Sequence, residues 1–151
     1  RPPFFTNAEG NEIANNLRTK AMAFFAIKFG QRLATDEEAD DFAVYLNYEV
    51  NRSAVCDTSK ILPEEAGDGY YAGIMTYRSL TKTQDPRPKI KTLTIPVLIL
   101  KGECDNQKWG FTNEYLQLFQ NHKLIVIPGA GHFISVEQPQ LYINAIEQFL
   151  N

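Results

Sequence analysis

Hydrophobic positions in the first part of the chain recur at helical spacing. Apolar side chains between residues 13 and 25 fall three or four positions apart, which predicts an amphipathic helix that ends at Gly30. Thr6 and Glu9 stand before it with the spacing of a capping box. No segment in this part alternates between apolar and polar residues as a strand would, so it is expected to be helical.

A second capping box follows at Thr35 and Glu38, ahead of a run whose apolar residues, from 39 to 50, share one helical face. Residues 62–71 are rich in Gly, Pro and acidic side chains and predict a loop. Residues 71–80 predict a third helix.

The pattern changes after a Pro-rich, basic stretch at residues 84–91. Two short, continuous apolar runs predict parallel strands buried on both faces. The expected elements are a strand at Pro96–Lys101, a helix at Thr112–Phe119, a strand at Lys123–Pro128 and a last helix capped by Ser135 and Gln138. This order predicts an α/β fold with a right-handed parallel unit. Sheets usually have about five strands, so the sheet is expected to be incomplete without a partner or a further part of the domain.

Composition excludes several classes of function. With 151 residues, 44% hydrophobic and 22% charged, the chain has the balance of a globular domain. A net charge of -3 gives no reason to expect nucleic acid or an anionic membrane as a partner. The apolar runs are too short to span a bilayer. No metal cluster, phosphate-binding Gly loop or dinucleotide fingerprint is present, so no cofactor or metal is expected.

The two cysteines, Cys56 and Cys104, are too few for a disulfide framework, and neither belongs to a CxxC pair. A reduced compartment, with the cytoplasm as the default, is therefore expected. Cys104 is predicted to be a small buried or half-buried thiol.

Two loops carry the candidate chemistry. Asp105 and His132 each stand four positions after the end of a predicted strand. Loops that follow parallel strands emerge at the same edge of a sheet, and neighbouring strands are about 4.8 Å apart. The two side chains can therefore meet, the carboxylate fixing the tautomer of the imidazole so that its other nitrogen acts as a base. The alternatives are a loop histidine that caps a helix or fills a turn, and an Asp in an Asx-turn. Glu103 is the rival acid, whereas His122 is expected on the solvated opposite edge.

These loops, Gly102-Glu-Cys-Asp105 and Gly129-Ala-Gly-His132, resemble the G-x-x-D and G-x-x-H loops that end α/β-hydrolases, and the resemblance covers residues 95–151. Among that family the chain is most similar to proline-iminopeptidase-like hydrolases. The resemblance implies a helical cap at residues 1–83, a connector at 84–94 and the last two strands of the hydrolase core, with their helices, at 95–151. It also favours Asp105 over Glu103 as the acid of a catalytic triad with His132.

The sequence departs from this family in one respect. None of its four serines lies in the G-x-S-x-G nucleophile elbow that such enzymes use. The nucleophile and the upstream strands are therefore expected outside this chain, and the missing N-terminal half of the core is its expected partner. Alone, the chain is expected to be inactive.

The resemblance implies hydrolysis of a small ester or amide, including N-terminal residues of peptides. Trp109, in the acid loop, is a candidate for lining the substrate pocket, or an aromatic that only packs the loop. Glu49 is a candidate anchor for a substrate amino group, or an exposed helical residue beside Arg52. The main alternative function is a non-catalytic module that binds a small ligand or a partner, and a flavodoxin-like module fits the helical first part less well.

Overall fold

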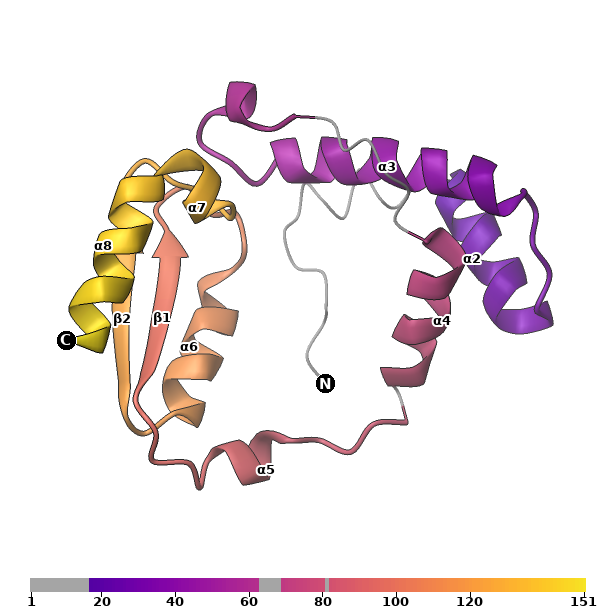
Figure 1. The fold of residues 1–151 in the computed structure, drawn as a ribbon. Helices are drawn as coiled ribbons and strands as arrows, with labels where there is room; N and C mark the ends of the chain where they lie inside the picture. Colours follow the sequence, from indigo (N-terminus) through magenta and orange to yellow (C-terminus); the bar gives the residue numbers. More distant parts are fainter. Residues whose placement is uncertain (1–16, 63–68, 81) are drawn as a thin grey trace. The chain divides into compact units, whose positions relative to one another are not determined.

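The computed structural model describes residues 17–62, 69–80 and 82–151. The chain divides into two compact units (Figure 1). Among the described residues, the helical unit comprises 17–51 with 62, 69–80 and 82–84, and the carboxyl-terminal unit comprises 52–61 and 85–151. The carboxyl-terminal unit thus includes ten residues from the segment expected to be a cap.

Three helices form the helical unit where the sequence predicts them. They are α2 (Leu17–Phe29), α3 (Asp36–Arg52) and α4 (Tyr70–Leu80). Gly30 follows the last residue of α2, as expected, and its N–H donates to the carbonyl of Ala26. Small and aromatic side chains from all three helices form one core cluster, made of Met22, Ala26, Ala39 and Tyr71.

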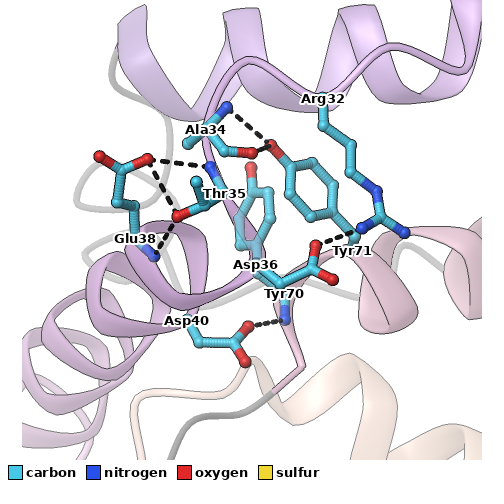
Figure 2. Close-up of polar contacts among 8 residues, drawn as sticks. All are labelled: Arg32, Ala34, Thr35, Asp36, Glu38, Asp40, Tyr70 and Tyr71. Carbon is cyan, nitrogen blue, oxygen red and sulfur yellow. Dashed lines mark hydrogen bonds and ion pairs between the residues drawn. The ribbon is translucent and has the colours of Figure 1, made fainter.

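The start of α3 confirms the second capping box (Figure 2). The Glu38 N–H donates to Thr35 Oγ1 at 3.2 Å, and the Thr35 N–H donates to Glu38 Oε2 at 2.9 Å. The reciprocal bonds satisfy backbone donors that the first turn leaves unpaired. Asp40, one turn further along α3, accepts the Tyr70 N–H at the start of α4. The first predicted capping box, at Thr6 and Glu9, lies outside the described residues.

Two parallel strands and their flanking helices form most of the carboxyl-terminal unit. Its elements are η1 (Thr58–Lys60), α5 (Arg87–Ile90), β1 (Val97–Gly102), α6 (Trp109–Leu118), β2 (His122–Ile127), α7 (Ile134–Glu137) and α8 (Pro139–Leu150). Both strands and the helix between them lie within two or three residues of their predicted bounds. Helix α5, within the connector, and η1 were not predicted.

One face of the two-stranded sheet is well covered. Ile127, Ala130 and Ala145 form a buried cluster, against which Leu100 and Ile125 pack, so this face meets α8. Residues alternate between faces along a strand, and Val126, on the other face of β2, is 43% exposed. Among the described residues, α8 covers one face of the sheet, and the expectation that both faces are buried fails at Val126.

The predicted cap of the last helix is wrong. Ser135 lies inside the short helix α7, and no side-chain hydrogen bond caps α8. Helix α8 begins instead with Pro139 in its first turn, where the missing N–H of proline costs no hydrogen bond. The Ser-x-x-Gln spacing matched a capping box, but a separate helical turn occupies that stretch.

The reciprocal cap predicts the outcome of a substitution at Thr35. Thr35→Ala should lower the free energy of unfolding by about 1 kcal/mol, because an N-terminal backbone donor of α3 loses its partner. Urea unfolding followed by circular dichroism measures the change, and Thr35→Ser, which keeps the hydroxyl, is the matched control. An alanine variant as stable as the serine variant would contradict the role of the cap.

Candidate active site

The two candidate loops leave the sheet at the same edge. Strands β1 and β2 are parallel, and their last residues, Gly102 and Ile127, are paired in the register. Helix α7 lies at this carboxyl end of the strands (Figure 1). The acid loop, residues 103–108, and the base loop, residues 128–133, therefore start side by side, as the sequence predicts for a parallel unit.

Hydrogen bonds join the acid loop to the base loop. The Glu103 N–H donates to the Ile127 carbonyl at 3.0 Å, and the Cys104 N–H donates to the Ala130 carbonyl at 2.9 Å. The Glu103 carboxylate in turn accepts the Gly129 N–H at 3.0 Å. Glu103, the rival acid, thus binds the backbone of the base loop.

Two glycines allow this close approach. A Cβ on Gly102 would lie 2.0 Å from the Gly131 carbonyl oxygen, and a Cβ on Gly131 would lie 2.2 Å from the Ala54 carbonyl oxygen. Both distances are far shorter than van der Waals contact, so any larger residue would push the two backbone segments apart. Contact between backbones therefore requires glycine at both positions.

The Asp105 carboxylate is shared by three donors. Its Oδ1 lies 3.5 Å from Nδ1 of His132, which is ion-pair range and longer than an ordinary hydrogen bond. The same oxygen accepts the Gln107 N–H at 3.0 Å, so the Asx-turn alternative is also present. Its Oδ2 accepts the Lys101 ammonium at 2.8 Å. The structure therefore brings Asp105 and His132 together while giving Asp105 a second, cationic partner.

These contacts set the charge of the pair. Burial alone would raise the pKa of Asp105, but the contacts with His132, Lys101 and the Gln107 N–H together lower it to about 2. Asp105 is therefore a carboxylate at neutral pH. The hydrogen-bonding contact with Asp105, together with the charge of that carboxylate, raises the pKa of the His132 ring above the ordinary value, against the opposing effects of partial burial and of Lys101. An anionic acid that favours the imidazolium is the electrostatic relation a catalytic pair needs.

His132 is held by its backbone and half open at its ring. Its N–H donates to the Ala54 carbonyl at 2.7 Å, and its side chain is 48% exposed. The N-cap residue of α7 is Phe133, without a side-chain hydrogen bond, so His132 does not cap that helix. With Nδ1 toward Asp105, Nε2 is the ring nitrogen left for a substrate or a nucleophile.

Residues 53–57 connect both loops, which the sequence did not predict. The Ser53 carbonyl accepts Nδ2 of Asn106 at 2.7 Å, beside Asp105. The Ala54 carbonyl binds the backbone of His132, as described above. We call residues 53–57 the strap. These two contacts use backbone carbonyls of the strap, which no sequence pattern marks.

Glu137 anchors the strap to the base loop. This residue is only 2% exposed, and its carboxylate accepts the N–H groups of Cys56 and Asp57, each at 2.8 Å, and of Gly131 at 2.5 Å. A buried carboxylate surrounded by donors is stabilised strongly, whereas an unpaired one would be very costly. Glu137 was not singled out from the sequence, because its partners are backbone N–H groups that leave no sequence pattern.

The cysteines form a disulfide, which corrects the sequence analysis. Cys56 of the strap is bonded to Cys104 of the acid loop. Neither residue is a free thiol, so the expected thiol at Cys104 is wrong. Two cysteines cannot build a framework, yet one pair is enough to join two segments. Disulfides are typical of oxidising compartments, so the structure does not support the reduced default.

The remaining candidates are Trp109, Glu49 and His122. Trp109 is the first residue of α6 and half exposed, and its ring lies 5.4 Å from Nζ of Lys101. Glu49 is a partly buried residue of α3, in the helical unit. His122 is exposed at the start of β2, as expected.

No helix in the described part of the chain is long and apolar enough to cross a membrane. Within the same residues, no group of three or more His, Cys, Asp and Glu side chains is arranged to hold a metal ion.

Removal of the disulfide should weaken the carboxyl-terminal unit. The bond closes a loop across 48 positions of sequence, for which a stabilisation of about 2–4 kcal/mol is typical. A reductant should therefore lower the urea midpoint of the wild-type protein. The double variant Cys56→Ser, Cys104→Ser should be equally destabilised and insensitive to reductant. Two titratable thiols in the unreduced native protein would contradict the bond.

Comparison with known proteins gives two similarities. A protein of Bacillus subtilis (strain 168), provisionally assigned as a 2-succinyl-6-hydroxy-2,4-cyclohexadiene-1-carboxylate synthase, is 29% identical over 62 residues, 41% of this chain and 23% of that protein. The crystal structure of proline iminopeptidase from Mycobacterium smegmatis matches 96% of this chain and 53% of its own, with 15% identity and a TM-score of 0.45. No protein-family model matches.

The chain therefore spans about half of the length of the iminopeptidase, and the aligned segment spans about a quarter of the synthase. In both comparisons this chain corresponds to part of a larger protein. Within the described residues the arrangement is mixed α/β, with two parallel strands and several helices.

Proposed function

We propose that this chain supplies the acid and the base of a Ser-Asp-His hydrolase whose nucleophile lies outside these 151 residues. The observation that carries the proposal is the Asp105–His132 pair. It stands on two loops at the carboxyl edge of adjacent parallel strands, with 3.5 Å between Oδ1 and Nδ1. An anionic, mostly buried acid beside a half-exposed imidazole is the arrangement that base catalysis requires.

In the complete enzyme, a serine attacks the carbonyl carbon of an ester or amide. Nε2 of His132 takes the hydroxyl proton and then gives it to the leaving group. Asp105 holds Nδ1 and stabilises the imidazolium that forms between these two transfers. Every step uses protein side chains, so this chemistry requires no cofactor or metal.

The substrate class rests on broader grounds. A Ser-Asp-His triad attacks carbonyl carbons, so a small ester or amide is the proposed class, including N-terminal residues of peptides. The iminopeptidase and the synthase have names that describe different reactions, so no narrower substrate is proposed. Trp109, half exposed at the start of α6, is the proposed apolar contact. Glu49 is the proposed partner of a substrate amino group, because a carboxylate is the natural partner of an ammonium.

A second function, binding of a small ligand or a protein without catalysis, is favoured by one observation. None of Ser53, Ser59, Ser79 and Ser135 lies in a G-x-S-x-G motif. A hydrolase-like domain without a nucleophile would keep the pocket and the acid–base pair while cleaving nothing. The two functions differ in whether the full-length protein contains a reactive serine.

Labelling of the full-length protein with a fluorophosphonate probe tests the proposed function. The probe should modify one serine, and His132→Ala should slow labelling by about 10²–10⁴-fold, because the general base is lost. His122→Ala is the matched control and should label at the wild-type rate, since His122 is exposed at the start of β2. Absence of labelling in the wild type, or equal labelling of the His132→Ala variant, would contradict hydrolysis.

A further inference from the structure

Lys101 is an unusual residue for its place in the fold. It is the next-to-last residue of β1, after four apolar positions, and only 3% of its side chain is exposed. Removal of an ammonium group from water is expensive unless it gains close partners. A lysine kept at this position therefore needs compensation from its surroundings.

That compensation comes almost entirely from the acid loop. The Lys101 ammonium donates to Oδ2 of Asp105 at 2.8 Å, to the Gln107 carbonyl at 3.0 Å and, at a longer 3.4 Å, to the Asp105 carbonyl. An ammonium has three donors, and each of them has an acceptor here. The ring of Trp109, 5.4 Å from Nζ, adds a cation–π contact.

The Asp105 carboxylate therefore faces two side chains that can carry positive charge. Oδ2 is held by Lys101, whereas Oδ1 lies toward Nδ1 of His132. The Lys101 ammonium is paired with the carboxylate at 2.8 Å, whereas His132 is charged only when it is protonated. If the carboxylate faced His132 alone, its full attraction would act on the imidazolium, and a larger share of the ring would be protonated, and so unavailable as a base, at neutral pH.

We propose that Lys101 is a positioning residue of the Asp105–His132 pair: it holds Oδ2 of the carboxylate, which leaves Oδ1 turned toward the imidazole and the Gln107 N–H, and it offsets enough negative charge to keep His132 available as a base. The catalytic meaning of this inference rests on the proposed function, but the electrostatic relation among the three side chains does not. It also gives Trp109 a second role, as the aromatic wall beside the Lys101 ammonium.

Other charged groups near the pair are fixed by separate contacts. Glu137 is held by three backbone N–H groups, and Glu103 is held by the Gly129 N–H. The ammonium of Lys60 donates to the Glu137 carbonyl, and the carboxylate of Asp57 accepts from Ser59. None of these contacts involves Lys101, so substitution of Lys101 should leave them in place.

A nuclear magnetic resonance titration tests this inference without any need for enzymatic activity. The chain has two histidines, so the imidazole signals of His132 can be followed with His122 as an internal reference. Lys101→Met and Lys101→Gln both remove the positive charge, and the glutamine also keeps a donor. In each, the proton affinity of His132 should rise by roughly tenfold. In Asp105→Asn it should fall below the wild-type value, and His122 should not change.

The direction in which the proton affinity of His132 changes distinguishes the proposed electrostatic role of Lys101 from a purely structural one. If Lys101 only held the loop in shape, its loss would displace Asp105, and the proton affinity of His132 would fall as it does in Asp105→Asn. A fall, or no change, in the folded Lys101 variants would overturn the proposal.

A measurement on the wild-type protein keeps the proposal testable even if both variants fail to fold. The ammonium protons of Lys101 should exchange with water far more slowly than those of Lys82, which is exposed. Equal exchange rates would overturn the buried contact with Asp105. The resonance data test the role of Lys101, whereas probe labelling tests the proposed function. A failure of one can therefore be distinguished from a failure of the other.

Discussion

The site depends on the carboxylate of Asp105. Its two oxygens bind three different donors, and each donor connects it to a different feature: Lys101 to the strand β1, Gln107 to the acid loop and His132 to the base loop. Because the carboxylate is largely buried, these contacts act in a medium that screens them less than water does. The local structure therefore keeps Asp105 anionic, with a pKa of about 2. This carboxylate in turn raises the pKa of His132.

The strap makes this arrangement rigid. Residues 53–57 contact the acid loop through the disulfide and Asn106, and the base loop through the backbone of His132 and the carboxylate of Glu137. A segment distant in sequence thus fixes the spacing of two loops that the sheet only brings near each other. The proposed catalytic pair would need such support behind it, and backbone groups of the strap provide much of it.

Sequence patterns predicted the part of this structure that depends on local rules. Apolar periodicity gave the three helices of the helical unit and both strands, and the parallel order then placed Asp105 and His132 at one edge. Long-range partners left no comparable signal. The Cys56–Cys104 bond joins residues 48 positions apart, and the role of Glu137 depends on backbone N–H groups that every sequence contains. Lys101 could be seen as a charge within an apolar run, but its partner could not.

A double-mutant comparison on the full-length protein tests most directly whether Asp105 acts through His132. The fluorophosphonate labelling rates of Asp105→Asn, His132→Ala and the double variant would be measured under one condition. Residues that act as a unit have strongly non-additive effects, so the double variant should label within about threefold of His132→Ala alone. Losses that multiply across the two substitutions would contradict the account, because they would show that the carboxylate and the imidazole act independently.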